Sequence, residues 1–133
     1  MRLNGGVMMK INEVSKKFGL SIDTLRFYEK IGLLEPIERV SGIRYYQQKD
    51  IERINVIKCM KKTGMSLEAI KEYFDLLSLG NASLLDRLNL LKKNREKALK
   101  ELEAMKQSIE FLEHKIEYTE NEIRKEIEKE GLN

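Results

Sequence analysis

The sequence contains little cysteine, histidine and proline, and it has no tryptophan. One cysteine and one histidine stand among 133 residues, so one chain cannot build a disulfide framework or a zinc site from them. We therefore expect neither a metal nor a cofactor. The sequence shows no Ser-His-Asp set, no paired carboxylates with a pocket and no glycine-rich phosphate loop, so we do not expect an enzyme. A lone thiol is typical of the reducing cytoplasm, where we expect the protein to be located.

Long apolar runs are also absent. No stretch approaches the roughly 20 apolar residues that a membrane helix needs, and we expect no membrane partner. The N-terminal MRLNGGVM lacks the hydrophobic segment of a signal peptide. It shows no periodicity either, so residues 1–8 are predicted to form a mobile leader or extension, with ordered sequence starting near Met9.

Charged residues, in contrast, are abundant and unevenly distributed. They make up 35% of the chain, with a net charge of +3. Residues 1–65 contain 13 Lys and Arg against 7 Asp and Glu, whereas residues 66–133 contain 12 against 15. A basic half with interleaved aromatic residues indicates a polyanionic partner. An ordinary solvated surface is the alternative.

The basic half begins with two predicted helices joined by a short turn. Apolar residues recur at helical spacing in residues 10–18, and Gly19 follows as a candidate C-cap. Ser21 is a good N-cap for a second helix, SIDTLRFYEKI. Two short helices around a turn that contains glycine are typical of a helix-turn-helix.

Two short strands and two further helices are predicted next. The segment GLLEPIERVSGIRYY contains a turn signal at Ser41-Gly42, so it predicts a β-wing. A third helix is predicted at about residues 48–62, and Ser66 would cap a fourth. The whole pattern predicts a mainly α protein with a winged helix-turn-helix at residues 9–80.

The last third of the chain predicts one long helix. Steps of four and three residues from Leu84 give a heptad seam in which ten of twelve positions are apolar. A single helix cannot bury such a stripe, so a second copy of the chain is the simplest partner, and folding back onto a small domain is the alternative. We expect a coiled-coil dimerisation helix at residues 81–129 and a tail at 130–133. The seam consists of Leu84, Leu88, Leu91, Arg95, Ala98, Leu102, Met105, Ile109, Leu112, Ile116, Thr119 and Ile123.

The order of these elements predicts a DNA-binding unit. The second helix would enter the major groove of double-stranded DNA, while Arg44 in the wing and Lys61 and Lys62 at the end of the third helix would hold phosphates. A coiled-coil interaction module whose basic head binds a protein or another polyanion is the alternative.

Several of these segments carry a family resemblance. INEVSKKFGLSIDTLRFYEKIGLL, followed by GIRYY, DIERINVIKCMKKTGMSLEAI and a long coiled coil, resembles the MerR family of bacterial transcription regulators. The match is detailed from about Met9 to Leu77. The resemblance implies homodimers joined by antiparallel long helices, here residues 84–127. Such dimers bind a palindromic promoter operator and distort it so that RNA polymerase can engage.

The resemblance also implies particular DNA contacts. They come from the second helix, the wing and the third helix, and basic residues at the end of the first helix add to them. The family usually has an aromatic residue before the wing arginine, where this sequence has Ile43. The candidate contacts are Lys16, Lys17, Ser21, Thr24, Arg26, Phe27, Tyr28, Arg39, Arg44, Tyr46, Lys61 and Lys62.

Cys59 is the candidate effector-sensing residue. The sequence lacks the cysteine sets of the family's metal and iron–sulfur sensors, and we expect no separate drug-binding domain after the coiled coil. The position of Cys59 resembles the aldehyde-responsive branch of the family. Lys62 shares its helix face and would favour the thiolate, whereas the C-terminal end of a helix disfavours an anion. An inert buried cysteine is the alternative, in a regulator with another effector or none.

Overall fold

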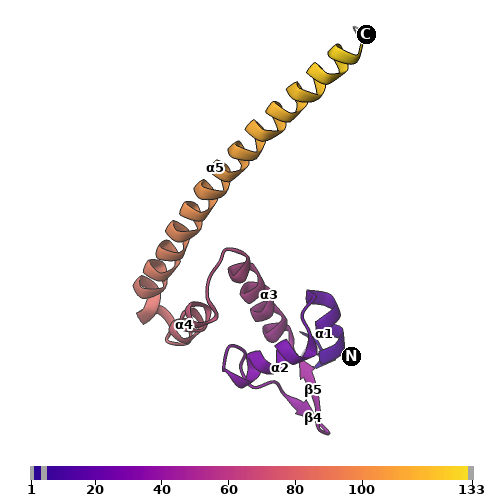
Figure 1. Ribbon diagram of the computed structural model, residues 1–133. Coiled ribbons are helices and arrows are strands. Elements are labelled where there is room, and N and C mark those ends of the chain that lie inside the picture. The colour runs from indigo at the N-terminus through magenta and orange to yellow at the C-terminus, as the bar shows by residue number, and fades with distance from the viewer. Residues whose placement is uncertain (1, 4–5, 132–133) are drawn as a thin grey trace. The chain divides into compact units, whose positions relative to one another are not determined.

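The computed structural model describes residues 2–3 and 6–131, and side chains from Met8 onward. Contacts divide the chain into two compact units, Met1–Asn94 and Arg95–Asn133. The long helix α5, Leu84–Gly131, contributes residues to both units (Figure 1). The sequence placed a boundary near residue 80. The contacts place it later because Leu90 of α5 packs against the core of the first unit.

Four helices of the first unit match the predicted pattern, and their ends have identifiable causes. Gly19 follows α1 in a left-handed conformation, φ 65°, which a glycine adopts without strain. Ser21 and Ser66 cap α2 and α4 by accepting hydrogen bonds from the backbone N–H groups of Thr24 and Ala69. The helices are α1 Ile11–Phe18, α2 Ile22–Lys30, α3 Gln48–Lys62 and α4 Leu67–Ser78.

A small antiparallel sheet contains the predicted wing and one strand that the sequence did not indicate. The order is β3-β5-β4, with β3 at Met9–Lys10, β4 at Arg39–Val40 and β5 at Ile43–Tyr46. The wing turns at Ser41 and Gly42, both with positive φ, where the turn was predicted. The prediction of two strands around a turn is therefore confirmed, and β3 extends the sheet on the other side of β5.

The predicted leader contains structure. Strands β1, Arg2–Leu3, and β2, Gly6–Val7, pair with each other, and the side chain of Met8 is buried. Regular secondary structure therefore begins before Met9, and Met8 leads directly into β3, while the mobility of the leader stays a prediction. For Met1, Asn4 and Gly5 the leader prediction lies outside the described residues.

The core of the first unit joins its helices to the loop that follows α2. Leu33 and Leu34 of this loop are fully buried. The guanidinium of Arg53 in α3 donates to the Leu33 carbonyl at 2.8 Å and stacks 4.0 Å from the centre of the Phe74 ring in α4. Arg53 thus connects α3, α4 and the segment that leads into the wing.

The predicted long helix is present, and its apolar side chains are exposed in the single chain. None of the residues of α5 is buried, and large seam residues such as Leu102 and Met105 are more than half exposed. The helix begins after the 3₁₀ turn η1, Gly80–Ser83, whose buried Ser83 hydroxyl donates to the Gly80 carbonyl at 2.8 Å. Among the described residues, no helix has the length and apolar character of a membrane span.

Candidate nucleic-acid interface

Helix α2 presents polar and aromatic side chains on the surface of the first unit. Arg26 and Phe27 are exposed, whereas the preceding residue, Leu25, is fully buried. The Ser21 and Thr24 hydroxyls lie 2.8 Å apart and bond to each other at the first turn. The cap that begins the helix therefore holds two of the predicted contact residues together at its N-terminus, where backbone N–H groups favour an anion.

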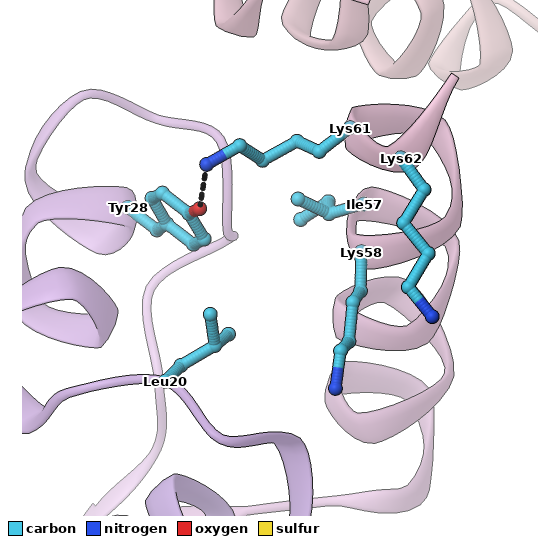
Figure 2. A pocket seen from close by; sticks show the side chains of 6 residues that line it. All are labelled: Leu20, Tyr28, Ile57, Lys58, Lys61 and Lys62. Carbon is cyan, nitrogen blue, oxygen red and sulfur yellow. Dashed lines mark hydrogen bonds between the residues drawn. The ribbon is translucent and has the colours of Figure 1, made fainter. Parts of the chain in front are cut away.

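The structure brings Tyr28 and Lys61 together, although they lie 33 positions apart in the chain. The Lys61 ammonium donates to the Tyr28 hydroxyl at 3.3 Å, as Figure 2 shows. Tyr28 as a whole is only 1% exposed. Tyr28 therefore belongs to the core, with its hydroxyl directed toward Lys61, and its contact with DNA stays a prediction.

This pair lines a pocket of about 250 Å³ between α2 and α3. Three lysines of α3 line one side of the pocket and contribute positive charge, and Leu20 contributes an apolar wall opposite them (Figure 2). Lys58 was not among the predicted contacts. Its ammonium donates to the Phe18 carbonyl at 2.6 Å, at the C-terminal end of α1, where a cation is favourable. Its spacing of three residues from Lys61 could have indicated it.

The wing arginine Arg44 has a partner within the chain. Its Nε donates to the Glu29 carboxylate at 2.9 Å, and the other Glu29 oxygen accepts the Ile37 backbone N–H at 3.3 Å. Both side chains of this ion pair are mostly buried. Sequence reasoning missed Glu29, which links α2 to the wing. Its position as the one acid in TLRFYEK is the signal that could have indicated it.

Tyr46, the other predicted contact on β5, lies in the core. Its side chain is fully buried, and its hydroxyl has no hydrogen-bond partner among the described residues. Burial, reinforced by the nearby Glu29 carboxylate, raises the pKa of Tyr46 to about 12. Strand alternation turns the Tyr46 side chain toward Met9 and the helices, so it offers no exposed surface to DNA, and its predicted DNA contact stays an untested prediction.

The remaining predicted contacts are exposed and have fewer links to one another. Lys16 and Lys17 lie in the last turn of α1, and Lys62 ends α3. Arg39 lies opposite Arg44 in the ladder of the wing. Exposure leaves these cations available to a phosphate backbone.

Cys59 is exposed on α3. In the single chain its thiol is therefore not buried, in contrast to the alternative of an inert buried cysteine. The described residues contain no group of three or more His, Cys, Asp or Glu side chains that could hold a metal ion.

Comparisons with known proteins agree with this geometry. A family model described as MerR HTH family regulatory protein matches residues 9–77. The HTH-type transcriptional regulator AdhR of Bacillus subtilis (strain 168) is 44% identical over 92 residues, 68% of this chain and 66% of AdhR. A MerR family transcriptional regulator from Bacillus thuringiensis is similar in structure, with a TM-score of 0.72 and 28% identity, over 83% of this chain and 97% of that chain.

A second solved structure contains DNA. It is HiNmlR, described as a MerR family regulator lacking the sensor domain, bound to promoter DNA; its TM-score is 0.77 at 29% identity, over 86% of this chain and 92% of that chain. The relatives are named as regulators, which confirms the prediction that this chain is a regulator and not an enzyme. The match over residues 9–77 and the shared winged fold show that the chain belongs to the MerR family of helix-turn-helix transcription regulators.

Proposed function

We propose that this chain is a homodimeric regulator that binds a palindromic promoter operator, distorts it and so controls access of RNA polymerase in the bacterial cytoplasm. One observation carries the proposal. Helix α2 exposes Arg26 and Phe27, and the same helix fixes the wing through the ion pair of Glu29 with Arg44. The helix and the wing are thus held as one unit that can meet two adjacent parts of a duplex.

The chemistry of each contact follows from its position. Arg26 on the exposed face of α2 suits a base edge or a phosphate in the major groove, and Phe27 suits apolar contact with a sugar or a thymine methyl group. Lys61 and Lys62 beside the pocket suit a phosphate, because both side chains are exposed and contribute positive charge there.

Dimerisation would double this surface. Two copies related by a two-fold axis place two recognition helices on the two halves of a palindrome. The exposed seam of α5 supports this arrangement, because its apolar side chains need a partner. HiNmlR, which is similar over most of its length, was solved on promoter DNA and supports the same mode of binding.

A salt titration with an operator duplex tests the proposal. Fluorescence anisotropy should show affinity that falls steeply with salt and prefers the palindrome over scrambled DNA. Arg26→Ala should weaken binding by about 1–3 kcal/mol. Arg124→Ala is the matched control, since it removes the same charge from α5. Equal affinity of both variants, or no preference for the palindrome, would contradict the proposed docking.

Cys59 supports a second, finer proposal: a response to reactive aldehydes. The exposed thiol can add to an aldehyde carbonyl carbon, forming a C–S bond while the carbonyl oxygen takes up the thiol proton. No other reactant is needed for this hemithioacetal. Modification at the end of α3, the helix that carries Lys61, would change the fit of the unit to DNA.

Cys59→Ser separates this proposal from the first. A reporter driven by the operator should lose its aldehyde induction in the variant, while the purified variant retains operator affinity. An unchanged response would exclude the thiol mechanism and leave a regulator with another effector or none. Loss of both induction and affinity would point to a structural role of Cys59 instead.

A further inference from the structure

The pattern of apolar and charged residues along the seam of α5 defines which residues meet when two copies pair. This inference rests on the dimer proposed above and deepens it, because it names the residues that meet. The seam starts at Leu84 and ends at Ile123, and Arg95 is its only charged position. All its large apolar side chains are exposed in the single chain.

The family resemblance implies antiparallel pairing of the long helices, and the position of Arg95 agrees with it. In a parallel pair each seam residue faces its own copy, so two Arg95 guanidinium groups would meet in the interface. Arg87 would also lie beside the partner's Lys92. Like charges in such contacts are destabilising. An antiparallel pair separates the two copies of Arg95 and avoids both contacts.

We propose that in this antiparallel pair the two-fold axis passes between Glu103 and Ala104. In this register Leu84 faces the partner's Ile123, and every seam residue faces another seam residue. The small Ala98 lies opposite the larger side chain of the partner's Ile109. Arg95 lies opposite the partner's Leu112, where its long stem can cover apolar surface while its charge reaches water.

Shifting the register by one heptad loses these matches. Moving the axis toward the C-terminus places Leu84 and Leu88 opposite the partner's Glu130 and Glu126. Moving it toward the N-terminus leaves Thr119 and Ile123 beyond the start of the partner's α5. Only the proposed register pairs the seam from end to end.

Charges beside the seam select the same register. In an antiparallel coiled coil, a residue that flanks the seam meets a partner residue of the same heptad position. Its partner lies about two residues away from the one that the seam pairing alone would place opposite it. Lys92 then meets the partner's Glu113, and Arg87 meets the partner's Glu122. Each pair forms twice by symmetry, and no like charges meet. The N-terminal shift would instead place Lys92 beside the partner's Lys106, and the C-terminal shift would bring the two copies of Lys106 together.

Lys92 and Glu113 are the residues to substitute in a test of the register. Both are exposed, and neither takes part in an ion pair among the described residues. Arg87 is less suitable, since its guanidinium already donates to the Ser83 hydroxyl at 3.0 Å and to the Gly80 carbonyl. Lys93, the next residue along the helix, points away from the seam at this spacing and provides a matched control.

Sedimentation equilibrium of the full chain measures the effect. Lys92→Glu should raise the dimer dissociation constant about tenfold, because two attractive exposed pairs become repulsive. Glu113→Lys should do the same. The double variant should return to the wild-type value, and Lys93→Glu should leave it unchanged. Circular dichroism checks that each variant keeps its helix content.

Mixing the two single variants gives a sharper result. Both contacts of the heterodimer pair opposite charges, so native mass spectrometry with one partner ¹⁵N-labelled should show mainly heterodimers. Rescue of Lys92→Glu by Glu120→Lys, and not by Glu113→Lys, would overturn the register in favour of the C-terminal shift. A stable dimer whose dissociation constant stays the same in all these variants would also overturn the register. A wild-type chain that is monomeric at micromolar concentration would overturn the proposed dimer itself.

Discussion

Glu29 fixes the wing to α2 through two hydrogen bonds, one to Arg44 and one to the Ile37 backbone. Arginine carries several N–H donors in a planar fork, so Arg44 can bond Glu29 through Nε and still offer donors to a phosphate. A lysine would have to divide a single ammonium between these partners. At the scale of the residue, Arg44 is therefore both an anchor of the wing and a candidate DNA contact.

Tyr46 leads to a prediction about pH. Its pKa is raised to about 12 in the folded chain, mainly by burial, from an ordinary value of about 10. The folded state thus holds the phenolic proton more tightly than the unfolded state. Its contribution to stability is complete below about pH 10 and is lost as the pH rises toward 12. Tyr46→Phe should flatten the fall in the free energy of unfolding over this range.

Urea unfolding at fixed protein concentration measures this effect. At pH 7 Tyr46→Phe should be neutral or stabilising by about 1 kcal/mol, because it removes a buried hydroxyl that has no partner among the described residues. Tyr118→Phe on α5 is the control, since Tyr118 is exposed. A loss of more than about 1 kcal/mol at pH 7 would mean that the Tyr46 hydroxyl is satisfied, for example by a bound water.

At the scale of the element, the cap of α2 should matter for DNA binding as well as for stability. Ser21→Ala removes the oxygen that accepts the Thr24 backbone N–H at 3.0 Å and should cost about 1 kcal/mol of unfolding free energy. Ser66→Ala removes the equivalent cap of α4 and should cost a similar amount. Anisotropy under conditions where both variants are folded should show lower operator affinity only for Ser21→Ala. Equal affinities would mean that the first turn of α2 does not contact DNA.

The helices could be predicted from the sequence because each has its own period and its own end signals. For α3 the predicted range of 48–62 is the observed one, and the isoleucines at spacing three are its buried face. Strand β3 could not be predicted, because two residues have no period and its partner β5 lies more than 30 positions away. Burial of Met8 has the same cause: it depends on a contact that a local pattern does not contain.

The sequence indicated which residues belong to the candidate site better than it indicated where their side chains lie. Alternation along β5 places Arg44 and Tyr46 on one face, but the sequence does not show which face meets the core. That face proves to be the inner one: Tyr46 enters the core, and Arg44 lies at its edge against Glu29. The meeting of Tyr28 with Lys61 required tertiary packing of α2 on α3, which no local pattern encodes.

At the scale of the whole molecule, the proposed dimer makes operator affinity depend on two copies acting together. One basic unit offers contacts for one half-site only, whereas a dimer adds the binding free energies of two half-sites in one event. In this proposal the second half of the chain, with fewer basic than acidic residues, supplies the seam, and the basic first half supplies the phosphate contacts. Dimerisation and DNA binding should therefore be coupled, although they use different surfaces.

Two similarly exposed side chains of α5 test this coupling. Leu102 lies on the seam and is 58% exposed in the single chain, whereas Phe111 lies off the seam and is 61% exposed. Leu102→Asp should raise the dimer dissociation constant by roughly three orders of magnitude, because the dimer loses two buried leucines and gains two buried carboxylates. Anisotropy should show much weaker binding to the palindrome and unchanged binding to a half-site. Phe111→Asp should alter neither, so dissociation of its dimer would place the interface on another face of α5.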